Sequence, residues 1–306
     1  MKLINRSTAV SAEQPLPWRT EHPAVRRLRR LTVGAVGAAI AFGLIATPLG
    51  DRALAAMEQT FRMQHMVGVG LSADDMTAIS NMLDNGSPDG DRRFDLAQYG
   101  TLTQSGGGES VVVNWEDAEQ RMGVSLFQLE NAAAPSYQPA STLTFRLNVK
   151  AVNRLLTRLG STTALPADAD GKAIALHIPE GVSSTGTLSG KQARLLQFGK
   201  PELTVDGAID AAAIREAVLG LPVLPDSLRT KLSAIGDWQH TLPVPAPDGA
   251  ITNLRLGGHD AVMTVNGSHR YLLWQGGDRM GLLGVAVHDF PAESDFLRAA
   301  EALILP

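Results

Sequence analysis

Cysteine is absent from the 306 residues of this chain. Its absence excludes a disulfide framework, a zinc site with thiolate ligands and a catalytic thiol. The folded part of the chain must therefore be held together by its apolar core. The chain is long enough for one large domain or two smaller ones.

Residues 31–50 lack any charged side chain. A helix needs about 20 mostly apolar residues to cross a hydrocarbon core of roughly 30 Å. Because unpaired backbone groups are costly in lipid, such a segment crosses as a helix. The sequence therefore predicts an N-terminal single transmembrane helix over residues 31–50.

Charge is divided unevenly on the two sides of this segment. Residues 1–30 hold seven of the 27 basic and two of the 31 acidic residues, which leaves 20 basic and 29 acidic residues for the rest of the chain. Basic residues next to a span stay on the cytoplasmic side, so residues 1–30 are predicted to be a short basic cytoplasmic segment. The bulk of the chain is then extracytoplasmic, and its acidic balance argues against a nucleic-acid partner.

A second interpretation of the N-terminus is open. The small residues Ala53 and Ala55 flank Leu54 in the pattern of a signal-peptide cleavage site, so the protein could be secreted after cleavage near Ala55. The apolar run is longer than the roughly 7–15 residues of a signal peptide, which favours a retained single-pass anchor in the cell membrane. Residues 56–306 leave the cytoplasm in both cases.

Strand-like runs and short helices alternate over residues 56–306. This pattern is typical of an α+β fold in which helices pack on an antiparallel sheet. The polar stretch 181–191 is predicted to be a loop that divides the region into two lobes, over 56–180 and 192–306. The second lobe is expected to end in a strand meander and a closing helix.

Alternating apolar residues predict strands in the first lobe over 61–69, 143–147 and 173–179, and three valines predict a short buried strand over 111–113. Helices are expected to follow polar N-caps. These caps are Ser72 with Asp75, Asn114 with Asp117, and Asn148.

In the second lobe, helices are predicted after Asp210 and around Leu228, Leu232 and Ile235. Four strand-like runs come next, separated in two places by the hairpin signals Asn266-Gly267 and Gly276-Gly277. The runs are 251–256, 261–265, 270–274 and 281–287, and the closing helix spans about 292–303.

The apolar positions of these elements are the predicted core. They are Ile79, Leu83, Leu155, Leu159, Ile214, Leu232, Leu272, Trp274, Leu283 and Leu303. Trp115 and Trp238 are further aromatic candidates for a core or a ligand groove.

The chemistry-bearing residues do not form a catalytic or metal-binding motif. No two histidines have the i, i+4 spacing of a helical metal site, and no serine lies in a G-x-S-x-G elbow. We predict no enzyme activity and no cofactor, and we assign no catalytic, cofactor-binding or metal-binding residue. An exported hydrolase would require the His-Asp pairs at 259–260 or 288–289 to meet a serine. The histidines are His22, His65, His177, His240, His259, His269 and His288.

Three other motifs have ordinary structural explanations. Residues 186–192 resemble a phosphate loop, but the spacing of the glycines is short by one residue and Gln192 replaces the magnesium-binding Ser or Thr. The carboxylate pairs Asp74-Asp75 and Glu116-Asp117 lie in the first turns of predicted helices, where negative charge is favourable.

Four stretches of the exported region carry a family resemblance: residues 61–83, 115–126, 159–179 and 271–303. They resemble the extracytoplasmic domain of unknown function that follows the membrane span in bacterial anti-sigma-factor-like regulators. The resemblance implies a non-catalytic regulatory or sensory protein whose outer domain binds a signal or a protein partner, such as a sigma factor or a regulatory subunit.

The chain departs from this family in its cytoplasmic part, which is short and has no cysteine. It therefore lacks the zinc-finger-like module that binds the sigma factor, and a separate subunit would have to supply it. The alternative function is an envelope ligand- or lipid-binding module of the lipoprotein-carrier type. A large apolar concavity would favour this alternative.

Overall fold

The computed structural model describes residues 59–75, 77, 96–207, 212, 215–216, 219–220, 224–238, 240–277 and 279–305. The predicted cytoplasmic segment, transmembrane helix and cleavage site lie outside these residues. Within the described part of the chain, no helix is both long enough and apolar enough to span a bilayer.

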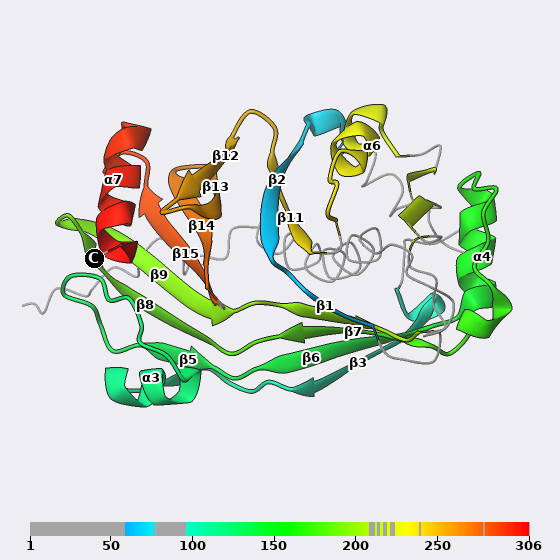
Figure 1. The fold of residues 1–306 in the computed structure, drawn as a ribbon, viewed down its shortest axis with the longest axis horizontal. Helices are drawn as coiled ribbons and strands as arrows, with labels where there is room; N and C mark the ends of the chain where they lie inside the picture. The colour runs from blue at the N-terminus through cyan, green and yellow to red at the C-terminus, as the bar shows by residue number, and fades with distance from the viewer. Residues whose placement is uncertain are drawn as a thin grey trace, which may run out of the picture. The chain divides into compact units, whose positions relative to one another are not determined.

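The described residues form a mostly β fold with few helices (Figure 1). This is α+β-like, as the sequence predicts, but with a larger share of strand than the predicted alternation of strands and helices. A five-stranded antiparallel sheet has the order β1-β10-β7-β6-β3, and an eight-stranded antiparallel sheet has the order β12-β13-β14-β15-β9-β8-β5-β4. The first comprises β1 (Gln59–Arg62), β10 (Glu202–Val205), β7 (Ala173–Ile178), β6 (Ser141–Leu147) and β3 (Gly100–Gly106). The second comprises β12 (Ile251–Leu256), β13 (His259–Asn266), β14 (His269–Gly276), β15 (Arg279–Ala286), β9 (Lys191–Gly199), β8 (Gly181–Leu188), β5 (Ser136–Gln138) and β4 (Val111–Val112).

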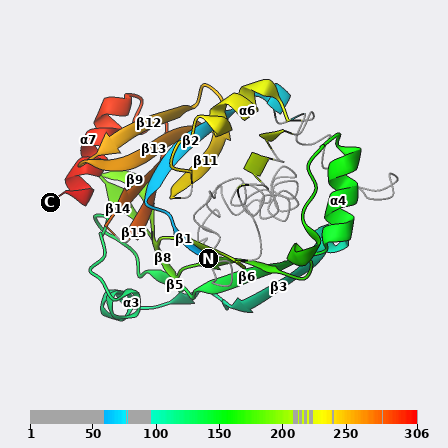
Figure 2. The ribbon, with the colours of Figure 1, turned by 45° about the vertical axis from the view of Figure 1, so that its right-hand side comes forward.

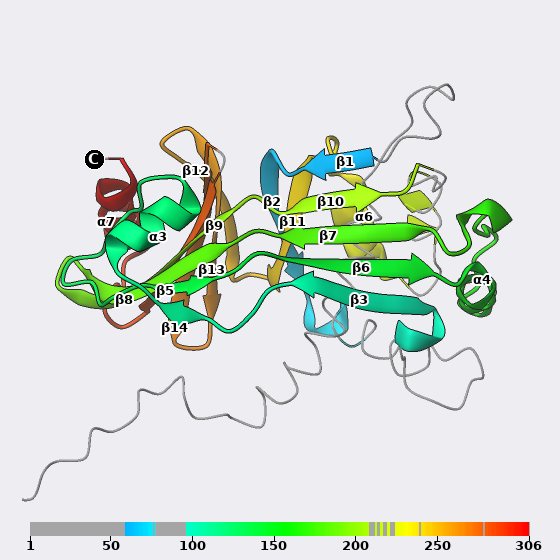
Figure 3. The same cartoon turned by 90° about the horizontal axis from the view of Figure 1, so that it is seen from below.

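Three strands of one sheet run on into strands of the other, as Figure 3 shows. The connections β5–β6, β7–β8 and β9–β10 are each two residues long, and each contains a proline: Pro139, Pro179 and Pro201. Proline cannot donate to a β-ladder. The two sheets are therefore end-to-end parts of one set of long strands, interrupted at matching positions.

The two faces of the five-stranded sheet differ in polarity. Alternate residues of β6, β7 and β10 are mostly apolar, and several of them are buried, among them Phe145, Ile174 and Leu203. On the opposite face, Thr103, Thr144 and Thr204 lie in one row across the sheet, with Ala175 between the last two. This alternation is the period of two expected for a sheet with one buried face.

The predicted N-caps of two helices are confirmed. Helix α3 (Trp115–Met122) follows Asn114, whose side chain accepts a hydrogen bond from the Asp117 amide at 2.7 Å. Helix α4 (Val149–Arg158) follows Asn148, which accepts from the Ala151 amide at 3.1 Å. Each cap satisfies an amide that the first turn of a helix leaves unpaired.

The capping box at Ser72 is also confirmed. The Ser72 amide donates to Asp75 Oδ2 at 2.8 Å, the Asp75 amide donates to Ser72 Oγ at 3.0 Å, and residues 73–75 are helical. Ser227 of helix α6 (Asp226–Ser233) donates to the other oxygen of Asp75 at 2.6 Å. The fully buried Asp75 therefore links α6 to the segment that follows β2 (His65–Leu71).

Helix α6 lies beside the parallel pair formed by β2 and β11 (Thr241–Pro247), as Figure 2 shows. Leu228 and Leu232 of the helix pack with Val69 and Leu71 of β2. Lys231 donates to the Gly70 carbonyl at 2.7 Å. The predicted apolar face around Leu228, Leu232 and Ile235 is therefore the contact face of this helix.

The free edge of β11 is made of prolines. The His240 carbonyl and the Asp248 amide both form hydrogen bonds with β2. The backbone N–H and C=O groups of the even-numbered residues of β11 therefore point toward that strand. The odd-numbered residues face away, and these include Pro243, Pro245 and Pro247. Because proline has no N–H, this edge cannot pair fully with another strand.

The predicted C-terminal meander is confirmed. Strands β12 to β15 pair in sequence order, with turns at Gly267 and Gly277. Helix α7 (Glu293–Ile304) closes the chain and buries Phe296 and Ala300 against the eight-stranded sheet.

Four of the predicted core residues are buried: Leu232, Leu272, Trp274 and Leu283. Leu155, Leu159 and Leu303 are half-buried, while Ile79, Leu83 and Ile214 lie outside the described residues. Most of the helix predicted after Asp210 also lies outside them.

Three local predictions are wrong. Residues 61–69 form parts of two strands, β1 and β2, which belong to different sheets. Residues 181–191 are mostly strand, since β8 and β9 form a hairpin there, and strands of both predicted lobes share the sheets. Strand β4 exists, but its valines are exposed because it lies at a sheet edge.

Replacing Ser227 by Ala should lower the free energy of unfolding of the full-length protein by about 1–3 kcal/mol, because a buried carboxylate loses a donor. Burial raises the pKa of Asp75, but hydrogen bonds from Ser227 and Ser72 outweigh it and hold the pKa below its ordinary value. The ionised carboxylate therefore stabilises the fold at neutral pH, and this contribution is lost as the pH falls through the folded-state pKa. Urea unfolding at several pH values measures the effect.

The matched control is Ser233→Ala on the same helix, whose hydroxyl donates only to the Thr230 carbonyl. It should change the stability by less than about 0.5 kcal/mol. Equal effects of the two substitutions would contradict the role of Asp75.

Candidate functional site

The candidate site is built around Trp274 of β14. Its cross-strand neighbour on β15 is Gly281, and a Cβ atom at that position would overlap the indole ring. The indole therefore lies flat over the backbone of β15, and only glycine leaves room for it. Trp274 is buried, so its predicted place in the core is confirmed, and its ring also lines a cavity.

A buried glutamine fixes the second aromatic ring of the site. Gln197 of β9 accepts a hydrogen bond from the Phe127 amide at 2.8 Å and donates to the Phe127 carbonyl at 2.9 Å. Only 3% of Gln197 is exposed, and these two hydrogen bonds satisfy both the oxygen and the nitrogen of its side-chain amide. The Phe127 ring lies 6.5 Å from that of Trp274 with an interplanar angle of 52°. Such tilted pairs are a preferred aromatic geometry.

Between these rings and the end of α7 lies a cavity of about 280 Å³. Its apolar lining comes from Phe127, Trp274, Met280, Ile304 and Leu305. Ligand sites in proteins are concave, mostly apolar and carry a few polar groups. This cavity has that composition, and its size suits a small molecule.

The polar groups that line the cavity are Gln197, His259 and Arg279. Arg279 lies 6.0 Å from the centre of the Phe127 ring and donates to the Ser125 carbonyl. Its guanidinium is always charged and keeps further N–H groups for other acceptors. Among the described residues that line the cavity, none carries a carboxylate. The cavity thus combines an apolar body with a cationic rim.

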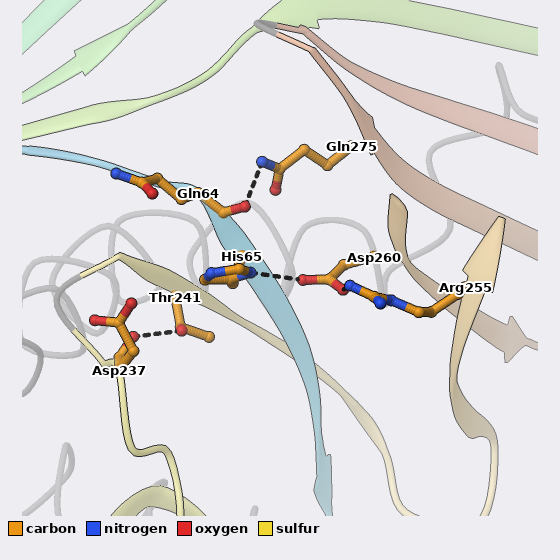
Figure 4. A network of polar contacts seen from close by, with 7 residues as sticks. All are labelled: Gln64, His65, Asp237, Thr241, Arg255, Asp260 and Gln275. Atoms are coloured by element: carbon orange, nitrogen blue, oxygen red, sulfur yellow. Dashed lines mark hydrogen bonds and ion pairs between the residues drawn. The ribbon is translucent and has the colours of Figure 1, made fainter. Parts of the chain in front are cut away.

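A second polar cluster lies where β2 meets the eight-stranded sheet (Figure 4). Asp260 of β13 contacts His65 at 3.1 Å through one oxygen and Arg255 at 3.3 Å through the other. Gln275 of β14 donates to the Gln64 carbonyl nearby. The cluster connects strands of two sheets, so its evident effect is structural.

Burial raises the pKa of Asp260, but hydrogen bonds from His65, the Met66 amide and Arg255 outweigh it. The pKa of this carboxyl is therefore below its ordinary value, and the ionised form stabilises the fold.

The histidines considered in the sequence analysis make separate contacts. Asp260 contacts His65 rather than its neighbour His259, which lines the cavity. His288 is exposed and lies 3.6 Å from Asp289. His177 contacts Thr142, His240 contacts Asp237, His269 contacts Ser268, and His22 lies outside the described residues. In the described part of the chain, no cluster of three or more His, Asp or Glu could hold a metal.

The phosphate-loop-like stretch is a tight hairpin between β8 and β9. A Cβ atom at Gly186 would lie 2.7 Å from the Glu130 carbonyl, which accepts a hydrogen bond from Thr187. The Gly190 amide donates to the Glu130 carboxylate at 3.2 Å. The close packing at Gly186 therefore explains this glycine. The Gly190 amide, which would bind a phosphate in a phosphate loop, is already hydrogen-bonded to an acidic side chain.

Sequence reasoning missed Phe127, Gln197 and Arg279. Their roles depend on contacts between segments far apart in the chain, such as the pairing of β9 with β15. The Trp274–Gly281 pair was missed as well, because a two-residue turn at Gly276-Gly277 would place Trp274 opposite Arg279. In the structure Gly276 itself pairs with Arg279, so Trp274 lies opposite Gly281. Two other tryptophans lie in the described part of the chain. Trp115 is the first residue of α3 and packs against Ala118 and Met122, and Trp238 is buried under the guanidinium of Arg215.

Comparison with models of protein families, with curated proteins and with solved structures found no match.

Replacing Gly281 by Ala should destabilise the full-length protein by about 1–3 kcal/mol or more, because the new methyl group overpacks the site and displaces the Trp274 ring. Gly284→Ala on the same strand is the control, since its Cβ would lie 3.1 Å from an edge atom of the half-buried Tyr271. Thermal unfolding compares the two. A larger loss for Gly284→Ala would contradict the packing of Trp274 described above.

Replacing Asp260 by Asn should lower stability by about 1 kcal/mol at neutral pH, because a charge-assisted network is lost. Since the folded-state pKa of Asp260 is depressed, the difference should shrink as the pH falls through that pKa. The control is the more exposed Asp237, which also pairs with a histidine. Its Asn variant should lose less free energy of unfolding than the Asp260 variant. A pH-independent difference would show that the charge of Asp260 is not involved.

Proposed function

We propose that the chain is a membrane-anchored, non-catalytic sensory protein whose extracytoplasmic domain binds a small molecule in the cavity beside Trp274. The observation that carries this proposal is an apolar cavity with two fixed aromatic rings and a cationic rim. The ligand class that fits is a small aromatic or aliphatic body with one anionic group.

The size of the cavity favours a small ligand over a lipid. Its volume of about 280 Å³ is close to the lower end of the roughly 300–1,000 Å³ found for ligand sites. The apolar face of the five-stranded sheet would be the natural surface for an acyl chain, but Phe145, Ile174 and Leu203 on that face are buried in the structure. The lipoprotein-carrier alternative therefore has less support than a small-molecule site.

The electrostatics of the rim favour an anion. Arg279 contributes a positive charge to this rim. His259 lies at the same cavity and is exposed. A carboxylate that entered with its apolar part against Trp274 and Phe127 could accept hydrogen bonds from Arg279.

The regulatory part of the proposal is supported by the sequence. The charge-free segment 31–50, the basic residues before it and the acidic remainder favour a single span with an outer domain. In an anti-sigma-like system, a signal bound outside would be passed to a cytoplasmic partner. Because segment 1–30 lacks the sigma-binding module, it would contact a regulatory subunit that carries this module.

Phenylacetate and its neutral analogue phenylacetamide form a matched pair of probes. We expect phenylacetate to bind the full-length protein about 3–10-fold more tightly, because only the anion gains a charge-assisted hydrogen bond. Arg279→Gln should remove this preference, whereas Arg255→Gln, at the other cluster, should keep it. Titrations followed by NMR of the tryptophan indole N–H signals measure both affinities.

The Trp274 signal is the one that disappears in the Trp274→Phe variant. If phenylacetate binds and this signal does not change, the proposed binding site beside Trp274 is wrong. Equal affinities of the two probes would contradict the role of the cationic rim.

A further inference from the structure

Strand β3 lies at an edge of the five-stranded sheet and has a free row of backbone groups. The Tyr99 carbonyl accepts from Asn148 and the Gly107 amide donates to Ala140, so the odd-numbered residues from 99 to 107 form the hydrogen-bonded pairs with β6. In an antiparallel ladder such pairs alternate. The amides and carbonyls of Leu102 and Gln104 therefore point away from β6.

The structure leaves this edge uncovered. Every residue from 101 to 106 is exposed. In the described part of the chain, the backbone amides and carbonyls of Leu102 and Gln104 have no hydrogen-bond partner on the outer side of β3. An open edge of this kind can pair with another strand.

Two other edges in the described part of the chain are protected. The outer edge of β11 consists largely of prolines. Strand β12 is engaged by β2, because Asn253 accepts a hydrogen bond from the Gly68 amide at 2.6 Å. Strand β3 has neither a proline nor a charged residue, which are the usual means of blocking an edge.

Exposed apolar side chains gather along the same edge. Of the five large hydrophobic residues described as exposed, three belong to β3 and β4: Leu102 at 39%, Val111 at 43% and Val112 at 73%. The two strands follow one another along this side of the two sheets (Figure 3). Open backbone groups and apolar side chains together are typical of a surface that is covered by a partner.

We propose that β3 pairs antiparallel with β3 of a second copy of this chain, about a two-fold axis that passes beside Thr103. In this register Leu102 of each copy forms a hydrogen-bonded pair with Gln104 of the other. Thr103 then faces its own counterpart. The five-stranded sheets of the two copies become one continuous sheet.

The sequence of β3 suits a second copy. A two-fold axis brings like residues together, so a charge near the axis would meet the same charge, and β3 has none. The residues that meet are threonines, and facing threonines are a favourable cross-strand pair. The register also pairs even-numbered residues only, which are those whose backbone groups are free.

The test uses the full-length protein in a mild detergent, with mass measured by light scattering after gel filtration. The wild type should be dimeric. Thr103→Lys and Thr103→Glu should each raise the dimer dissociation constant about tenfold or more, because like charges then face each other directly. An equimolar mixture of the two variants should restore the dimer, because the facing charges are then opposite.

Thr252→Lys is the control. Thr252 is exposed on the edge strand β12, so the substitution adds the same charge away from β3 and should leave the dimer unchanged. A monomeric wild type would overturn the proposal, as would a dimer that survives both charge variants. Failure of the mixture to recover would exclude a symmetric pairing at Thr103. None of these outcomes depends on ligand binding at the cavity.

Discussion

The structure depends above all on the backbone pairing of β9. This strand pairs with β8 on one side and with β15 on the other, so it joins the C-terminal meander to strands from the earlier part of the chain. It also continues through Pro201 into β10, which belongs to the other sheet. Leu195 at its centre is fully buried. The two ladders of β9 hold the eight-stranded sheet together, and the short connection to β10 ties that sheet to the five-stranded one.

The candidate site follows from the same strand. Gln197 of β9 holds Phe127, while β15 beside it provides Gly281 and Arg279. The aromatic rings are therefore fixed by the sheet itself, and a preformed cavity needs little rearrangement to bind a ligand. The proposed site is at one part of the eight-stranded sheet, and the proposed pairing surface is an edge of the five-stranded sheet. Ligand binding and self-association thus use different elements, and the long strands run between them.

Local sequence signals predicted many elements correctly. Asn114 and Asn148 begin helices because a side-chain oxygen can satisfy an amide of the first turn, and that depends only on neighbouring residues. The hairpin turns at Gly267 and Gly277 follow from positive φ angles that glycine adopts readily. Where the prediction was wrong, the outcome depended on distant partners. Polar residues in 181–191 form strand because β9 and β5 supply the hydrogen bonds to β8.

The sequence by itself determined the helix caps, the C-terminal meander, the closing helix and the α+β class with antiparallel sheets, because these follow from short-range chemistry and apolar periodicity. Only the tertiary structure decided that residues 61–69 serve two sheets, that Val111 and Val112 lie at an exposed edge, and that Gln197 clamps Phe127. The physical reason is that sheet pairing and cavity formation depend on contacts between residues far apart in the chain. Alternation of apolar and polar residues indicates a strand, but it does not specify which strand will be its neighbour.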